Sequence, residues 1–172
     1  MLNYAKHSID SRDIKQVIKV LRYKNITQGS EVIKFEKTLG KIFGAKDVAA
    51  LSNGTAALHL SGIVLGWKPG DIVLTTPITF ASTANSIIYS GAKVDFVDIN
   101  ATTYNIDVNL LEEKIKNYRK KRIKVKSVIA VDYAGHPCDW KELKFLSKKY
   151  SFSLINDNCH AIGAKYQNTL KY

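Results

Sequence analysis

The sequence has no apolar run long enough to cross a membrane. No stretch approaches the ~20 consecutive apolar residues of a spanning helix, and the first residues, Met1 to His7, lack the apolar core of a signal peptide. We therefore expect a cytoplasmic protein with no membrane partner. Of its 172 residues, 45% are hydrophobic and 24% charged, which is typical of a soluble globular protein and does not indicate disorder.

Cysteine is scarce as well. Cys138 and Cys159 are the only two, and they lie in different motifs without the spacing of a disulfide framework or of a zinc site. We therefore expect no bound metal, and we interpret Cys159 as a small packed side chain.

Acidic residues are fewer than basic ones, which gives a formal net charge of +11. Much of the excess lies in residues 114–126, where Lys120, Lys121 and Arg122 are consecutive. Such a run can bind nucleic acid or an anionic membrane, because neutralising phosphates releases counterions. Its only aromatic residue is Tyr118 and no nucleic-acid-binding motif accompanies it, so we favour a solvated linker and keep nucleic-acid binding as the alternative.

Strand-like runs alternate with helical patterns along most of the chain. The short β-capable runs are 48–51, 72–75, 94–97, 125–131 and 153–155. Their connections are too long for hairpins, which favours parallel strands joined by crossovers. We predict an α/β fold of three layers, a mostly parallel sheet with flanking helices. Residues 1–30 are predicted to form an N-terminal helical arm, and residues 31–172 one domain.

Candidate functional residues stand beside the predicted strands. Asp157 and His160 follow the last run, Phe80 follows 72–75, and Asn53-Gly54-Thr55 separates 48–51 from an apolar helix. Ligands of open α/β sheets bind beyond the carboxyl ends of the strands. We therefore expect these residues to lie near one another.

Each of these features has two interpretations. Asn53-Gly54-Thr55 can bind a phosphate through free N–H groups at the helix start, or simply cap that helix. Phe80 can stack on a flat ring or pack in the core, and Asp157 with His160 can form a reactive site or an ordinary polar loop. Together, a phosphate cradle, an aromatic face and a carboxylate are what the phosphate, ring and pyridine nitrogen of pyridoxal phosphate require.

Ordered motifs along nearly the whole chain resemble the DegT/StrS-type sugar aminotransferases, which are fold-type I pyridoxal-phosphate enzymes. The segments that carry the resemblance are 26–29, 35–36, 52–58, 77–85, 132–135 and 157–163. The resemblance implies an incomplete large domain of that fold. It also implies that Asn53, Gly54 and Thr55 bind the cofactor phosphate, that Phe80 stacks on the ring, that Asp157 pairs with the pyridine nitrogen, and that His160 lies beside the ring.

The resemblance extends to partners and substrate. It implies that Thr27, Gln28 and Gly29 lie near the substrate, and that a homodimer builds each site from both subunits. Segments 75–86, 131–135 and 165–168 look most like the members of pseudaminic acid biosynthesis. Those enzymes convert the 4-keto group of a UDP-linked 6-deoxy-N-acetylhexosamine into an amine, with glutamate as the amino donor.

One element of the family pattern is missing. In the family the Schiff-base lysine follows in a Ser-Phe-His-x-x-Lys segment, whereas this sequence ends at Tyr172, and Lys165 and Lys171 have no such motif. We therefore expect no catalytic residue here, and we interpret the chain as the N-terminal part of an aminotransferase. Alternatives are an inactive module that binds pyridoxal phosphate or a partner, and an enzyme completed by a separate C-terminal half. An exposed sheet edge should make the isolated chain aggregate or need a partner.

Overall fold

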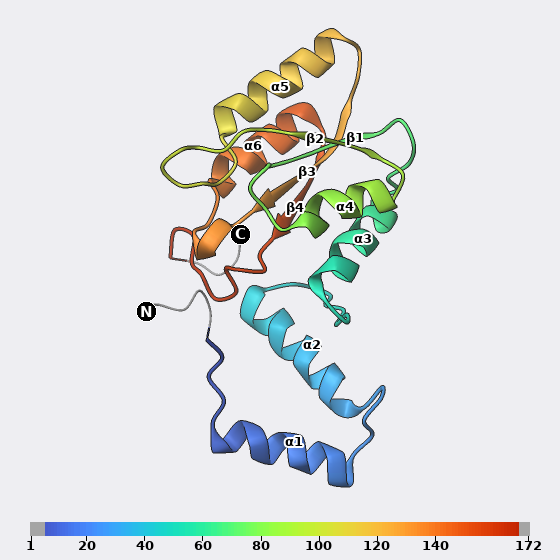
Figure 1. Cartoon of the computed structure of the whole chain (residues 1–172), viewed down its shortest axis with the longest axis vertical. Helices are drawn as coiled ribbons and strands as arrows, with labels where there is room; N and C mark the ends of the chain where they lie inside the picture. The colour runs from blue at the N-terminus through green and yellow to red at the C-terminus, as the bar shows by residue number, and fades with distance from the viewer. Residues whose placement is uncertain (1–5, 169–172) are drawn as a thin grey trace. The chain divides into compact units, whose positions relative to one another are not determined.

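The computed structural model describes residues 6–168 (Figure 1). The chain divides into two compact units, one up to Ala50 and one from Leu51 onward. Each unit is described by itself below. Within the described residues, no helix is long and apolar enough to cross a membrane.

The N-terminal unit has two helices, α1 (Ser11–Tyr23) and α2 (Ser30–Phe43). An ion pair between Lys24 and Glu31 joins them. The Glu36 carboxylate of α2 accepts a hydrogen bond of 2.8 Å from the Ala50 N–H, which ties the segment after α2 to that helix. The compact N-terminal unit thus extends to Ala50, and the predicted domain organisation, an arm of residues 1–30 followed by one domain, stays a prediction.

Both N-terminal helices leave their apolar side chains accessible. Neither contains a buried residue. On α1 the predicted apolar stripe of Ile14, Val17, Ile18 and Leu21 is formed, yet each of these residues is between 42% and 59% exposed. The stripe is thus an amphipathic face that its own unit leaves exposed.

The C-terminal unit is built on a four-stranded parallel sheet of order β2-β1-β3-β4. Its strands are β1 (Ile72–Thr75), β2 (Lys93–Phe96), β3 (Val125–Val131) and β4 (Ser153–Asp157). All three neighbouring pairs are parallel, so the carboxyl ends of the strands meet at one edge of the sheet. The predicted parallel α/β sheet is confirmed.

Helices cover both faces of this sheet, which gives three layers (Figure 1). One face carries α3 (Gly54–Val64) and α4 (Ala81–Tyr89), and the other carries α5 (Val108–Lys120) and α6 (Trp140–Tyr150). Side-chain alternation along β1 explains the arrangement. Ile72 and Leu74 belong to the core under α5 and α6, whereas Val73 belongs to the core under α3 and α4.

The predicted strand at 48–51 is wrong. These residues have no strand conformation, and none of the four described strands pairs with them. A β-capable run becomes a strand only when a neighbouring strand accepts its hydrogen bonds. The run therefore leads as an irregular segment into α3.

Candidate cofactor site

A pocket of about 390 Å³ lies at the carboxyl edge of the sheet. It brings together every residue that the sequence predicted to bind the cofactor: Asn53, Gly54, Thr55, Phe80, Asp157 and His160. These residues come from the start of α3, the loop after β1 and the end of β4 with the loop that follows it. The structure thus places them together, and their binding to a cofactor stays a prediction.

The start of α3 combines a helix cap with free N–H groups. The Asn53 side chain caps the helix, because its Oδ1 accepts a hydrogen bond of 2.8 Å from the Ala56 N–H. The N–H groups of Gly54 and Thr55 have no acceptor among the described residues. Capping and anion binding are therefore compatible here, because the cap uses a later N–H and leaves two donors at the positive end of the helix dipole.

Gly54 lies against the loop that follows β4. A Cβ atom at Gly54 would be 3.1 Å from the Cys159 Sγ atom, which is tighter than an ordinary carbon contact. Glycine therefore lets the start of α3 approach the Cys159 loop closely, as a shared phosphate and ring site requires.

Asp157 is a buried carboxylate with a fixed orientation. It ends β4 and is 6% exposed. Its Oδ2 accepts a hydrogen bond of 2.9 Å from the Thr83 hydroxyl, which lies 2.8 Å from the Thr79 hydroxyl. Its Oδ1 accepts one of 3.3 Å from the Cys159 N–H. A carboxylate oxygen has two lone pairs, so Asp157 can accept a further hydrogen bond from a ligand in the pocket.

Aromatic rings form another part of the pocket. Phe80 lines it and remains 72% exposed, so a ligand ring could stack on its face. The rings of Tyr133 and His160 meet edge to face, with centroids 6.1 Å apart. Tyr133 lines the pocket as well, although it is not among the residues predicted from the sequence. The rule that identified Asp157 would have found it, because Tyr133 also lies just beyond the end of a strand.

Cys159 lines the pocket with a thiol of raised pKa. Burial raises the pKa of its thiol to about 11, and the hydrogen bond to Asp157 and the charge of that carboxylate add to the effect. The thiol is therefore protonated at neutral pH. Our interpretation of Cys159 as a packed side chain is only partly right, because the residue counts as exposed.

The residues predicted to lie near the substrate belong to the other unit. Thr27, Gln28 and Gly29 form the bend between α1 and α2, and Gln28 has a left-handed backbone with φ of 51°. Their closeness to the substrate stays a prediction. Across residues 6–168, no group of three or more His, Cys, Asp or Glu side chains could hold a metal ion.

Comparisons with known proteins agree on one family. Residues 7–171 match the model of the DegT/DnrJ/EryC1/StrS aminotransferase family. A curated relative is the UDP-4-amino-4,6-dideoxy-N-acetyl-beta-L-altrosamine transaminase of Campylobacter jejuni serotype O:2. It is 40% identical over 168 residues, which cover 98% of this chain and 43% of the relative.

Solved structures extend the agreement to the fold. Helicobacter pylori PseC, an aminotransferase involved in the biosynthesis of pseudoaminic acid, matches with a TM-score of 0.85 and 33% identity over 97% of this chain and 44% of its own. GDP-4-keto-6-deoxymannose-3-dehydratase with a trapped PLP-glutamate geminal diamine matches with a TM-score of 0.87 and 27% identity, over 97% and 43%. The chain spans less than half the length of these relatives.

Proposed function

Because the chain belongs to the DegT/DnrJ/EryC1/StrS aminotransferase family, we propose that its pocket holds pyridoxal phosphate as part of a nucleotide-sugar aminotransferase. The observation that carries this proposal is the convergence of a helix N-terminus, an exposed aromatic ring and a buried carboxylate in one pocket. The three features come from separate segments of the chain. Each matches one chemical group of the cofactor.

The residues present fit the cofactor. The free N–H groups of Gly54 and Thr55 donate to the phosphate, and the Thr55 hydroxyl can add a third donor. Phe80 would offer a face for the ring to stack on, and the Asp157 carboxylate would keep a proton on the pyridine nitrogen by favouring its charged form. When bound, pyridoxal phosphate supplies an electron sink for the carbon beside a substrate nitrogen. His160, which also lines the pocket, would lie beside the ring.

The substrate that we propose is a UDP-linked 6-deoxy-N-acetylhexosamine with a 4-keto group, and the amino donor is glutamate. The names of the Campylobacter and Helicobacter relatives support the sugar, and the trapped glutamate in the dehydratase structure supports the donor. Thr27, Gln28 and Gly29 contact the substrate in this proposal. The assembled enzyme is a homodimer.

The lysine that links the cofactor covalently lies outside this sequence in our proposal. No lysine lines the pocket among the described residues, and Lys165 is exposed elsewhere. Borohydride reduction of the chain mixed with pyridoxal phosphate, followed by peptide mass mapping, should therefore give no stoichiometric lysine adduct. Stoichiometric labelling of Lys165 together with amino transfer by this chain alone would contradict this assignment.

A cofactor-binding module without catalysis is the second candidate. The same pocket favours it, since binding needs only the phosphate, ring and carboxylate contacts. Adding the C-terminal half of a full-length relative distinguishes the two functions. The aminotransferase proposal predicts glutamate-dependent amination in the mixture, whereas the module predicts cofactor binding without amination.

The pocket itself is tested by titrating the chain with pyridoxal phosphate and following absorbance. Asp157→Asn removes the charge opposite the pyridine nitrogen, and loss of a charge-assisted hydrogen bond should weaken binding by about tenfold or more. Asp47→Asn is the matched control, because Asp47 is exposed and lies in the other unit. Equal affinities of the Asp157 and Asp47 variants would refute the assigned site.

A further inference from the structure

A second cavity, the basic groove, lies at the opposite end of the strands from the cofactor pocket, where β3 begins. It has a volume of about 380 Å³, and no Asp or Glu lines it among the described residues. Its cationic side chains are Arg119, Arg122, Lys124 and Lys149. The seven residues of β3 separate it from the cofactor pocket by roughly 20 Å at the usual rise per residue. The groove is therefore not part of the cofactor site.

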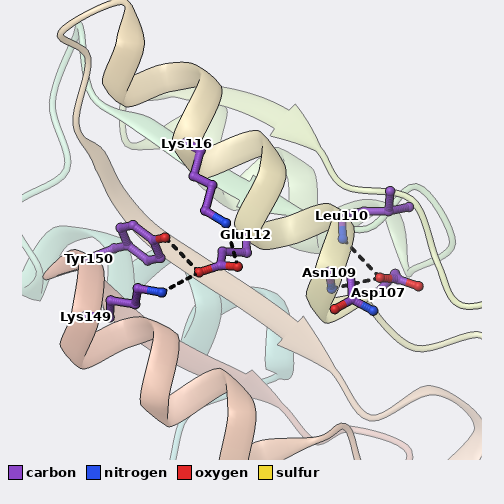
Figure 2. Close-up of polar contacts among 7 residues, drawn as sticks. All are labelled: Asp107, Asn109, Leu110, Glu112, Lys116, Lys149 and Tyr150. Atoms are coloured by element: carbon purple, nitrogen blue, oxygen red, sulfur yellow. Dashed lines mark hydrogen bonds and ion pairs between the residues drawn. The ribbon is translucent and has the colours of Figure 1, made fainter.

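Glu112 of α5 holds one wall of the basic groove in place through its contacts with Lys149 and Tyr150 of α6 (Figure 2). The Glu112 carboxylate accepts hydrogen bonds from Lys116 at 2.9 Å, Lys149 at 2.8 Å and the Tyr150 hydroxyl at 2.7 Å. The hydrogen bond from Lys116, followed by those from Lys149 and Tyr150, lowers the pKa of Glu112 to about 2. Glu112 therefore stays charged, compensates Lys149 and holds the Tyr150 ring in place.

The other three cations have no acidic partner within residues 6–168. No described carboxylate forms an ion pair with Arg119, Arg122 or Lys124. The Arg119 guanidinium lies 5.5 Å from the centre of the Tyr150 ring, a cation–π distance. Arg119 is thus oriented beside a fixed ring while its charge remains available.

Helix dipoles account for only part of this charge. Both α5 and α6 end at the groove, and each helix C-terminus carries roughly half a negative charge. Two ends together offset about one of the three unpaired cations. The groove therefore retains an excess of about two positive charges, which the fold itself does not use.

Arg122 occupies a backbone position that suits glycine. Its φ is 60°, in the left-handed region. Its N–H donates to the Arg119 carbonyl at 2.9 Å, and the Ile123 N–H donates to the Tyr118 carbonyl at 3.0 Å, so the helix ends in a Schellman turn. An arginine there is disfavoured relative to glycine, and its side chain lines the groove.

We propose that the basic groove binds a small anion with more than one phosphate group, such as free polyphosphate. Guanidinium groups bind phosphate oxygens in a bidentate fashion, so Arg119 and Arg122 suit adjacent phosphates and Lys124 adds a point charge. The volume of the groove matches a small ligand. The exposed Ser151 beside it can donate a hydroxyl.

The probe is inorganic tripolyphosphate, titrated calorimetrically into the chain with saturating pyridoxal phosphate so that the cofactor pocket is blocked. The triple variant Arg119→Gln, Arg122→Gln, Lys124→Gln should bind at least about tenfold more weakly, with a smaller salt dependence. The control Lys46→Gln, Lys68→Gln, Lys144→Gln removes the same charge from exposed lysines elsewhere and should retain binding. Equal affinities of the two triple variants would overturn the proposal.

Arg122→Gly separates binding from folding. Glycine suits the left-handed turn, so the melting temperature should be no lower while tripolyphosphate binds more weakly. Unchanged affinity in this variant would overturn the role of Arg122. A single-stranded oligonucleotide and phosphatidylglycerol vesicles complete the test. If either binds through the groove residues while tripolyphosphate does not, the small-anion proposal is wrong.

Discussion

Thr83 illustrates how one buried hydroxyl can determine the orientation of the candidate site. The residue is fully buried and donates its hydrogen bond to Asp157, the carboxylate proposed to face the pyridine nitrogen. No local pattern predicts this pair, because the partners are 74 positions apart. Strand ends identified Asp157 from the sequence, but its supporting partner depends on how α4 packs against the sheet.

Removal of that hydroxyl should lower the affinity for pyridoxal phosphate without unfolding the chain. Thr83→Val keeps the shape and deletes the donor, so affinity for pyridoxal phosphate should fall by about three- to tenfold, the effect of one hydrogen bond to a charged group. Thr83→Ser keeps the donor and should restore most of the affinity, as measured by absorbance titration. If the Val and Ser variants bind alike, the hydroxyl does not orient Asp157.

The pKa of the Cys159 thiol depends in part on the charge of Asp157. Its pKa of about 11 means that the rate of alkylation by iodoacetamide should rise with pH up to about 11, above the usual thiol range. Asp157→Asn removes the carboxylate charge that raises the pKa, so the midpoint of the profile should move to lower pH. Cys138 is 1% exposed and should not react in the folded chain. Identical profiles for the wild type and the Asn variant would contradict the contact.

At the scale of elements, burial decided which sequence patterns formed as expected. The runs 72–75 and 125–131 became strands over those same residues, because both lie inside the sheet between two helical layers. The run 48–51 has the same apolar character but no partner strand among the described residues, so its local preference did not produce a strand. Pairing is a tertiary property that composition alone does not reveal.

The end of α5 provides a stability test of backbone conformation. Arg122→Gly should raise the free energy of unfolding by about 0.5–1 kcal/mol, because glycine avoids the left-handed penalty. Lys121→Gly is the control. Lys121 has an ordinary φ of −83°, so glycine there gains nothing and should lower stability. Urea titrations measure both, and a loss of stability in the Arg122 variant would contradict the strain argument.

At the scale of the whole molecule, accessible apolar surface bears on assembly. The N-terminal unit leaves the stripe of α1 about half exposed, and burying the remaining half of each side chain against a partner contributes about 0.8–1.5 kcal/mol, half of the value for full burial. We therefore expect Ile14→Asp with Leu21→Asp to shift self-association toward monomer in sedimentation velocity. Ser11→Asp with Gln16→Asp, at exposed polar positions of α1, makes the same change of two charges without removing apolar area. An equal shift in the control pair would assign the effect to charge instead.

The sheet adds a second reason to expect assembly. Within residues 6–168, β4 pairs with β3 on one side and with no strand on the other. An unpaired strand edge is a template for a further strand. The expected aggregation or partner requirement of the isolated chain thus has a structural source as well as an apolar one, and it stays a prediction.

The close approach of Gly54 to Cys159 also constrains how related sequences can vary. With only 3.1 Å between a residue 54 Cβ and the sulfur, a side chain at position 54 requires the Cys159 side chain to move by a few tenths of an ångström or to be smaller. The two positions should therefore co-vary across homologues, with alanine or glycine more frequent at 159 where 54 carries a side chain. The substitutions tolerated at either position alone are then limited by the side-chain volume at the other.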